Sequence, residues 1–344
     1  MIDQYLDFAV EEIVNLVNIP SPTGFTIQAT NYIFAELKKM GYNPEKTRKG
    51  SVLCHLGGDG EGVILAAHVD TLGAMVRALK SNGRLRFTKL GGYPESYIET
   101  ENCLIHTRDG KKFSGTIQMI NPAVHVNGEL PNTKRDDKNM EVVVDAKVFS
   151  QDDLIKLGIS TGDFISLDPR LVVTEEGFIK SRHLDDKASA GLLLTLAKIV
   201  KDGLLKLKQS TYLLFTTYEE VGHGASTGIP RDVVDFISVD MGAVGDDLTT
   251  DEYKVSICAK DSAGPYDYAL TTELINIAKV NNLNYAVDIY PHYGSDADVA
   301  LKAGYDLRHA LIGPGVAASH GYERTHREGL QNTLNLLALY VGRN

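Results

Sequence analysis

Helical segments alternate with short apolar strands towards both ends of this 344-residue sequence. The segments from Leu6 and from Gly191 repeat apolar residues at a helical period, whereas the runs from Gly62 and from Ser210 are rich in β-formers. A GGDGEG turn joins the strand from Ser51 to the strand from Gly62, as in a hairpin. This alternation predicts an α/β fold, a mixed sheet flanked by helices.

The middle of the chain has a different character. Between residues 72 and 163 short strands alternate with many turn residues, as in CLIHTRDGKKFSGTIQMI. This pattern is typical of a small all-β domain, here one inserted into the α/β domain. The α/β domain is therefore expected to be discontinuous, with residues 1–71 and 164–344, and its length allows ample core.

Composition narrows the class of protein. The net charge is −10, from 35 basic and 45 acidic residues, and no dense Lys/Arg block is present, so nucleic acid is not an expected partner. The cysteines Cys54, Cys103 and Cys258 lack C-x-x-C spacing, which argues against a disulfide framework or a thiolate zinc site. Acidic residues near the N-terminus do not suit a signal peptide, and the apolar run broken by Lys198 is too short for a bilayer. A cytoplasmic protein without membrane contact is expected.

Metal-ligand residue types follow three of the predicted strands. In an open α/β sheet the ligand crevice lies beyond the carboxyl ends of the strands, so these side chains are expected to converge. Each one alone has an ordinary explanation as a core histidine, a helix cap or a solvated acid. The set comprises His68 and Asp70, Glu219 and Glu220, Asp240, the helix-start pair Asp185 and Asp186, and His320.

Two histidines with several carboxylates exceed the three protein ligands that a single hydrolytic zinc ion typically takes. They suit two divalent cations, about 3.5–4 Å apart, bridged by one shared carboxylate. His68 and Asp70 lie two residues apart on a strand and point to the same side. Asp70 is therefore expected to orient the imidazole of His68 rather than to bind metal.

The ordered set of motifs resembles the co-catalytic metallo-aminopeptidases of the glutamyl and tetrahedral aminopeptidase family. The likeness spans nearly the whole chain, including a domain inserted between the His-x-Asp strand and the Asp-Asp helix. The motifs, in order, are IPSPTG from Ile19, AAHVDTLG from Ala66, LGISTGD from Leu157, LDDKASAG from Leu184, YEEVG from Tyr218 and SVD from Ser238.

The resemblance implies a role for each matching residue. His68 and Asp240 would bind the first metal, Glu220 and His320 the second, and Asp185 would bridge them, with Asp70 orienting His68. Glu219 would be the general base that activates water for hydrolysis of the N-terminal peptide bond of a peptide. Zinc or cobalt is expected and manganese is compatible with these ligands.

The resemblance also implies assembly. The inserted domain would mediate dimerisation, and dimers of relatives often form hollow tetrahedral dodecamers. Two positions depart from the family pattern: Thr71 stands where many members have a Glu, and His326 competes with His320 for the last ligand position. We favour His320, because His326 lies against the following helix, where a capping or packing role is expected. The preferred first residue of the substrate cannot be read from the sequence.

Other functions compete with this one. GASTG, from Gly224, fits the G-x-S-x-G motif and would make Ser226 the nucleophile of a serine hydrolase, which requires a strand before it and a helix after it. Pro230 stands where that helix should run. A metal-stabilised assembly protein and a glycosidase, whose carboxylate pair needs no metal, are further alternatives.

Overall fold

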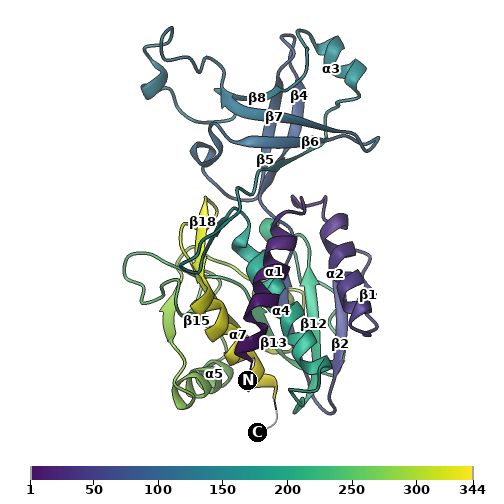
Figure 1. The fold of residues 1–344 in the computed structure, drawn as a ribbon, viewed down its shortest axis with the longest axis vertical. Coiled ribbons are helices and arrows are strands. Elements are labelled where there is room, and N and C mark those ends of the chain that lie inside the picture. The colour runs from purple at the N-terminus through teal and green to yellow at the C-terminus, as the bar shows by residue number, and fades with distance from the viewer. Residues whose placement is uncertain (1, 343–344) are drawn as a thin grey trace. The chain divides into compact units, whose positions relative to one another are not determined.

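The computed structural model describes residues 2–342. The chain forms two compact units, one of Met1–Asp70 with Arg170–Asn344 and one of Thr71–Pro169 (Figure 1). Each unit has its own hydrophobic core.

The larger unit is built on a mixed sheet. Within residues 2–342 this sheet has nine strands, in the order β1 (Glu45–Lys46), β2 (Val52–Gly57), β12 (Ser210–Thr216), β3 (Gly62–His68), β13 (Val233–Val239), β17 (Arg308–Val316), β15 (Val255–Lys260) and β16 (Tyr285–Ile289), with β14 (Gly242–Ala243) beside β17. A separate small sheet contains β10 (Val172–Val173), β11 (Phe178–Ser181) and β18 (Glu323–His326). The predicted hairpin is wrong, because β12 lies between β2 and β3 and pairs with both.

Helices cover both faces of the large sheet. Val63, Leu65 and Ala67 of β3 face one core, and Ile64 and Ala66 face the other, as the alternation of side chains along a strand requires. α6 (Asp296–Lys302) packs in the second core. The first core takes α1 (Leu6–Val17), α2 (Ile27–Lys39), α4 (Leu184–Lys201), α5 (Tyr268–Val280) and α7 (Arg327–Val341).

A close helix contact explains one glycine in this core. α1 and α4 run side by side (Figure 1), and a Cβ on Gly191 would lie 2.6 Å from Cγ1 of Ile13. Glycine at this position therefore lets the two helices approach each other closely.

The register of the central strands brings the site residues together. β3 lies between β12 and β13 and is parallel to both, with Thr216 beside His68 and Ser238 beside Ala66. The carboxyl ends of all three strands therefore meet at one edge of the sheet. This is the edge at which open α/β sheets bind their ligands.

The smaller unit is a closed antiparallel barrel. Its core is apolar and includes Val76, Phe87, Ile105 and Ile117. A short helix, α3 (Gln151–Leu157), precedes the last strand and is capped by Ser150. The barrel strands run in the order β4 (Gly73–Leu79), β5 (Leu85–Leu90), β8 (Met140–Val144), β7 (Lys112–Met119), β6 (Asn102–His106) and β9 (Phe164–Leu167). The predicted α/β fold with an inserted all-β domain is confirmed.

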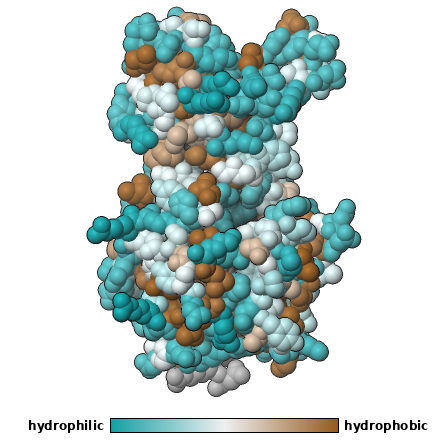
Figure 2. Space-filling model, turned by 180° about the vertical axis from the view of Figure 1, so that it is seen from behind, coloured by the Kyte–Doolittle hydropathy of each residue, from teal (hydrophilic) through white to brown (hydrophobic). Residues whose placement is uncertain are grey.

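Two observations concern the surface. Among residues 2–342 no helix is long and apolar enough to cross a membrane. On the face seen in Figure 2, hydrophobic residues are interspersed with hydrophilic ones. Large apolar side chains are nevertheless strongly exposed in both units, among them Tyr268 and Val280 of α5 and Val126 and Phe149 of the smaller unit.

Candidate metal centre

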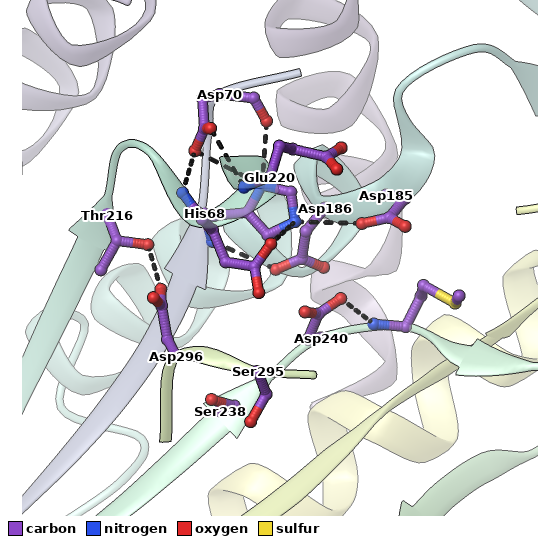
Figure 3. A network of polar contacts seen from close by, with 12 residues as sticks. His68, Asp70, Asp185, Asp186, Thr216, Glu220, Ser238, Asp240, Ser295 and Asp296 are labelled. Carbon is purple, nitrogen blue, oxygen red and sulfur yellow. Dashed lines mark hydrogen bonds and ion pairs between the residues drawn. The ribbon is translucent and has the colours of Figure 1, made fainter. Parts of the chain in front are cut away.

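His68, the last residue of β3, lies at the centre of a buried cluster of carboxylates (Figure 3). Its Nδ1 is 2.9 Å from the backbone carbonyl of Asp70, and its Nε2 is 3.0 Å from Oδ1 of Asp185. A carbonyl oxygen only accepts, so Nδ1 must carry the proton of a neutral ring. Without a metal, Nε2 can approach the Asp185 carboxylate this closely only as a protonated donor, whereas with a cation between them it would present a lone pair to the metal.

Asp185 lies between the two predicted histidine ligands. While Oδ1 faces His68, Oδ2 lies 3.4 Å from Nε2 of His320 and accepts a hydrogen bond from Ser319 at 3.1 Å. Burial raises the pKa of Asp185, but hydrogen bonds with His320 and His68 outweigh it and bring the pKa well below the usual range. One carboxylate thus presents a different oxygen to each histidine.

Asp240 follows β13 directly, and its Oδ1 accepts a 2.6 Å hydrogen bond from the backbone of Met241. One potential ligand atom from each of His68, Asp185 and Asp240 lies within 4.8 Å of the others. Burial and the charge of Asp185 raise the pKa of Asp240 to about 7. These three side chains form a group able to hold one metal ion.

The adjacent acids Glu219 and Glu220 lie on a turn. The sequence predicts a strand that reaches them, but β12 ends at Thr216, and Tyr218 adopts a left-handed conformation with φ +68°. The two acids then open a short 3₁₀ turn, η4 (Glu219–Val221), in which successive side chains point about 120° apart. They diverge because of this turn, not because of strand alternation.

The two acids face different histidines. Oε2 of Glu219 is 3.8 Å from Nε2 of His68, and Oε2 of Glu220 is 3.6 Å from Nε2 of His320. Oε1 of Glu220 is buried and has no hydrogen-bond partner. Burial and the charge of Asp185 raise the pKa of Glu220 to about 8, and burial also raises that of Glu219 well above its usual value.

The carboxylate of Asp70 supports the Glu pair. It accepts hydrogen bonds from the backbone N–H groups of Glu219 at 3.1 Å and Glu220 at 3.3 Å, and from the hydroxyl of Thr23 at 2.7 Å. Its Oδ1 is 3.8 Å from Nδ1 of His68, so the backbone carbonyl makes the closer contact with the imidazole. Asp70 therefore contacts both halves of the cluster, through different atoms.

Two more acids lie near the cluster: Asp186, which the sequence includes among the candidate ligands without a specific role, and Asp296, which it does not include. Asp186 accepts a 3.3 Å hydrogen bond from the backbone N–H of His68, and its other oxygen is buried without a hydrogen-bond partner. Asp296 accepts from the hydroxyl of Thr216 and from the backbone of Ala225, so it joins the end of β12 to the loop after the Glu pair (Figure 3). The acid-rich GSDAD stretch from Gly294 was the signal for Asp296.

Two competing residues have other contacts. His326 caps α7: its Nδ1 accepts from the backbone of Glu328 at 3.1 Å, and its Nε2 lies 2.8 Å from the carbonyl of Glu176. Ser226 donates to the carbonyl of His223 at 3.0 Å and lies on a loop that leads into β13, with no helix after it. The strand-to-helix elbow of a serine hydrolase is not formed there.

A cavity of about 570 Å³ opens beside the cluster. Its lining includes Asp185, Glu219, Glu220, Asp240 and His320. The cavity is also lined by residues outside the cluster, which include Ser262, His292, Tyr293, Asp298 and Lys302. A substrate held in this space would lie directly against the carboxylates.

The donor set suits metal ions. The carboxylates outnumber the histidines, and in the absence of cations burial holds several of their pKa values high. Bound divalent cations would reverse this effect, because they favour the ionised form of each carboxylate. The unpartnered oxygen of Glu220 is available as a ligand, and a bound cation would take the place of the Nε2 proton of His68, which otherwise bonds Asp185.

Comparison with known proteins identifies the family. A sequence profile described as M42 glutamyl aminopeptidase matches residues 50–336. The chain belongs to the M42 glutamyl aminopeptidase family. It is therefore a metallo-aminopeptidase, a hydrolase of peptide bonds.

Relatives of this M42 peptidase agree with the assignment. The Bacillus subtilis (strain 168) protein named "Putative aminopeptidase YhfE" is 46% identical over 334 residues, which cover 96% of this chain and 96% of that protein. The glutamyl aminopeptidase of Lactococcus lactis subsp. cremoris is 24% identical over 247 residues, 70% of this chain and 68% of its own length.

Solved structures share the fold of the M42 chain. A TET aminopeptidase from a Thaumarchaeota archaeon superposes with a TM-score of 0.88 at 19% identity and covers 97% of each chain. The TET1 peptidase of Pyrococcus horikoshii, described as able to assemble into a tetrahedron or a large octahedral shell, gives a TM-score of 0.85 at 20% identity and covers 98% of this chain and 100% of its own.

Proposed function

We propose that this aminopeptidase uses two divalent cations and that Glu219 is its general base. The observation that carries the proposal is the position of Asp185, whose two oxygens face His68 and His320. A carboxylate between two histidines matches the bridging ligand of a two-metal site.

The proposed ligands divide into two groups around Asp185. His68 and Asp240 would complete the first site, because potential ligand atoms of His68, Asp185 and Asp240 all lie within 4.8 Å of one another. Glu220 and His320 would complete the second, at the other oxygen of Asp185. Nitrogen and carboxylate ligands of this kind accept zinc, cobalt or manganese.

The proposed mechanism assigns the proton transfers to Glu219. Two bound cations would polarise the scissile carbonyl and acidify the attacking water. Glu219 would accept a proton from this water and donate it to the leaving amine as the peptide bond breaks. Its carboxylate is 3.8 Å from the His68 imidazole, and its backbone is held by Asp70, so the side chain lies beside the ligands on a fixed turn.

Assembly belongs to the same proposal. We propose that the inserted domain, residues 72–163, mediates dimerisation and that dimers form a dodecamer. Exposed apolar side chains support association in general, since Val126 is 76% and Phe149 is 72% exposed in the smaller unit. The tetrahedral assembly described for the Pyrococcus horikoshii structure supports the larger state by analogy. A native mass of one chain would contradict it.

Metal removal and restoration test the activity. The chelated protein, with zinc, cobalt or manganese restored separately, is assayed on a panel of aminoacyl-nitroanilides and short peptides. We expect hydrolysis only with metal, and only of peptides with a free amino terminus. N-acetylated peptides and cello-oligosaccharides are the controls, and turnover that survives chelation would contradict the metal mechanism.

A further inference from the structure

Glu323 connects two of the proposed ligands without being one of them. It is the first residue of β18, and only 2% of it is exposed to solvent. Its Oε1 accepts a hydrogen bond from the backbone N–H of His320 at 3.0 Å, and its Oε2 accepts one from the backbone N–H of Asp185 at 3.1 Å. Because each oxygen already accepts a hydrogen bond from a backbone N–H, this carboxylate binds the protein backbone and is not one of the proposed metal ligands.

The small sheet fixes the position of Glu323. In the ladder between β18 and β11, Glu323 pairs with Ser181, and the chain continues from Ser181 towards Asp185. On the other side, the loop that carries His320 leads directly into Glu323. The side chain therefore joins two loops that belong to distant parts of the sequence but supply neighbouring ligands.

The backbone at His320 needs such support. His320 adopts a left-handed conformation with φ +64°, which is unfavourable for a residue with a side chain. Conformations of this kind persist only where the surrounding structure determines them. The hydrogen bond from the His320 N–H to Glu323 is one contact that holds this loop in place.

We propose that Glu323 is a positioning residue that sets the spacing between Asp185 and His320, and so builds the second metal site. This inference rests on the proposed function. A carboxylate is suited to the task because both of its oxygens accept hydrogen bonds. Glutamine has nearly the same shape but would direct its NH₂ group at one of the two N–H donors and leave that donor unpaired.

Metal affinity tests the proposal without relying on turnover. The full chain is freed of metal and titrated with zinc in competition with a chromophoric chelator. We expect Glu323→Gln to weaken one of the two binding events about 10- to 100-fold, the range found for residues that orient metal ligands, and to leave the other nearly unchanged.

Glu252 offers a matched control. It is also buried, and its carboxylate is bound by Arg324, the residue next to Glu323, instead of by the ligand loops. Glu252→Gln is expected to keep the affinity of the wild-type chain at both sites, even where its melting temperature falls as much as that of Glu323→Gln. Equal loss of affinity in both variants would make Glu323 a merely structural residue.

The remaining outcomes are distinct. Wild-type affinity at both sites in Glu323→Gln would overturn this inference and leave the proposed function intact. A wild-type chain that binds only one zinc ion would overturn the proposed function and the inference with it. If Glu323→Gln does not fold, Glu323→Asp retracts both oxygens by one methylene and is expected to weaken the same event; unchanged affinity in it would count against the proposal.

Discussion

Two buried histidines, one in each unit, differ in a way that separates a reactive centre from an ordinary core. His68 ends β3 and His106 ends β6, and they are 2% and 3% exposed. Burial lowers the pKa of both. For His68 the hydrogen bond that the ring donates to Asp185, together with the charges of Glu219 and Asp240, outweighs burial and raises the pKa well above its usual value. For His106 burial and the charge of Lys112 lower the pKa to about 4.

The surroundings of each histidine account for this difference. His106 lies 2.8 Å from the hydroxyl of Ser166, a neutral partner on the adjacent strand of the barrel. His68 is surrounded by side chains that follow three parallel strands and the start of α4. A buried histidine at a strand end therefore gains a chemical role only where the topology gathers carboxylates around it.

The largest effect is expected within the acid cluster. Glu219→Gln should lower kcat about 10²- to 10⁴-fold with both metals retained, because the amide cannot accept the proton of the attacking water. Glu220→Gln should instead lose one metal, since the amide is a weaker ligand. Steady-state assays on an aminoacyl-nitroanilide, combined with metal analysis by mass spectrometry, measure both effects. Loss of metal from Glu219→Gln would reverse the two assignments.

Replacing each histidine by asparagine in a separate variant tests the difference between His68 and His106. His68→Asn should abolish binding at the first metal site, whereas His106→Asn should leave both sites intact. The barrel variant should lose about 1–3 kcal/mol of stability, because the Ser166 hydroxyl loses a buried partner. Zinc titration and urea unfolding of each full-length variant give the two readouts. Weaker zinc binding in His106→Asn would contradict the separation of roles.

Two glycines extend the comparison to the backbone. A Cβ on Gly224 would lie 2.0 Å from Oδ1 of Asp296, and one on Gly115 of the barrel would lie 2.7 Å from the carbonyl of Val143. Alanine at either position should cost about 1–3 kcal/mol through overpacking. Only Gly224→Ala should also lower kcat/KM, because Asp296 holds the loop that follows the Glu pair. Thermal melting and peptide assays of both variants check this. Unchanged turnover in Gly224→Ala would show that activity does not depend on the loop contact made by Asp296.

Much of the architecture could be predicted from the sequence because it depends on local patterns. Apolar strands, helical periods and the turn-rich middle region are each visible within a short window. Strand order is not local, and the placement of β12 between β2 and β3 was missed for this reason. The end of β12 was also misjudged, because the left-handed turn at Tyr218 carries no glycine to signal it.

The site was predictable only as a set of residue types at strand ends. The partners that hold those residues in place are set by contacts between distant segments. The carboxylate of Asp70 reaches the backbone of the Glu pair, and Glu323 reaches Asp185 and His320. Nothing in the sequence near Glu323 distinguishes it from a surface acid, so its role follows only from the three-dimensional structure.

The smallest expected effect is a pH dependence of stability that arises from His106, the histidine whose pKa is lowered by burial. The pKa of His106 is about 4 in the folded chain and about 6.5 in an unfolded one, so between these values the unfolded chain binds more protons at this residue. The contribution of His106 to the stability of the barrel should therefore be fully present above about pH 6.5 and decrease as the pH falls towards 4. In His106→Asn this contribution is absent, and the difference in stability between wild type and variant should shrink from pH 7.5 to pH 5. Hydrogen exchange of the β6 and β7 amides in the full chain, corrected for intrinsic rates, follows the barrel separately from the acid cluster. A difference that stays constant with pH would mean that His106 has the same pKa in the folded and the unfolded chain, and the lowered pKa that distinguishes it from His68 would then be absent.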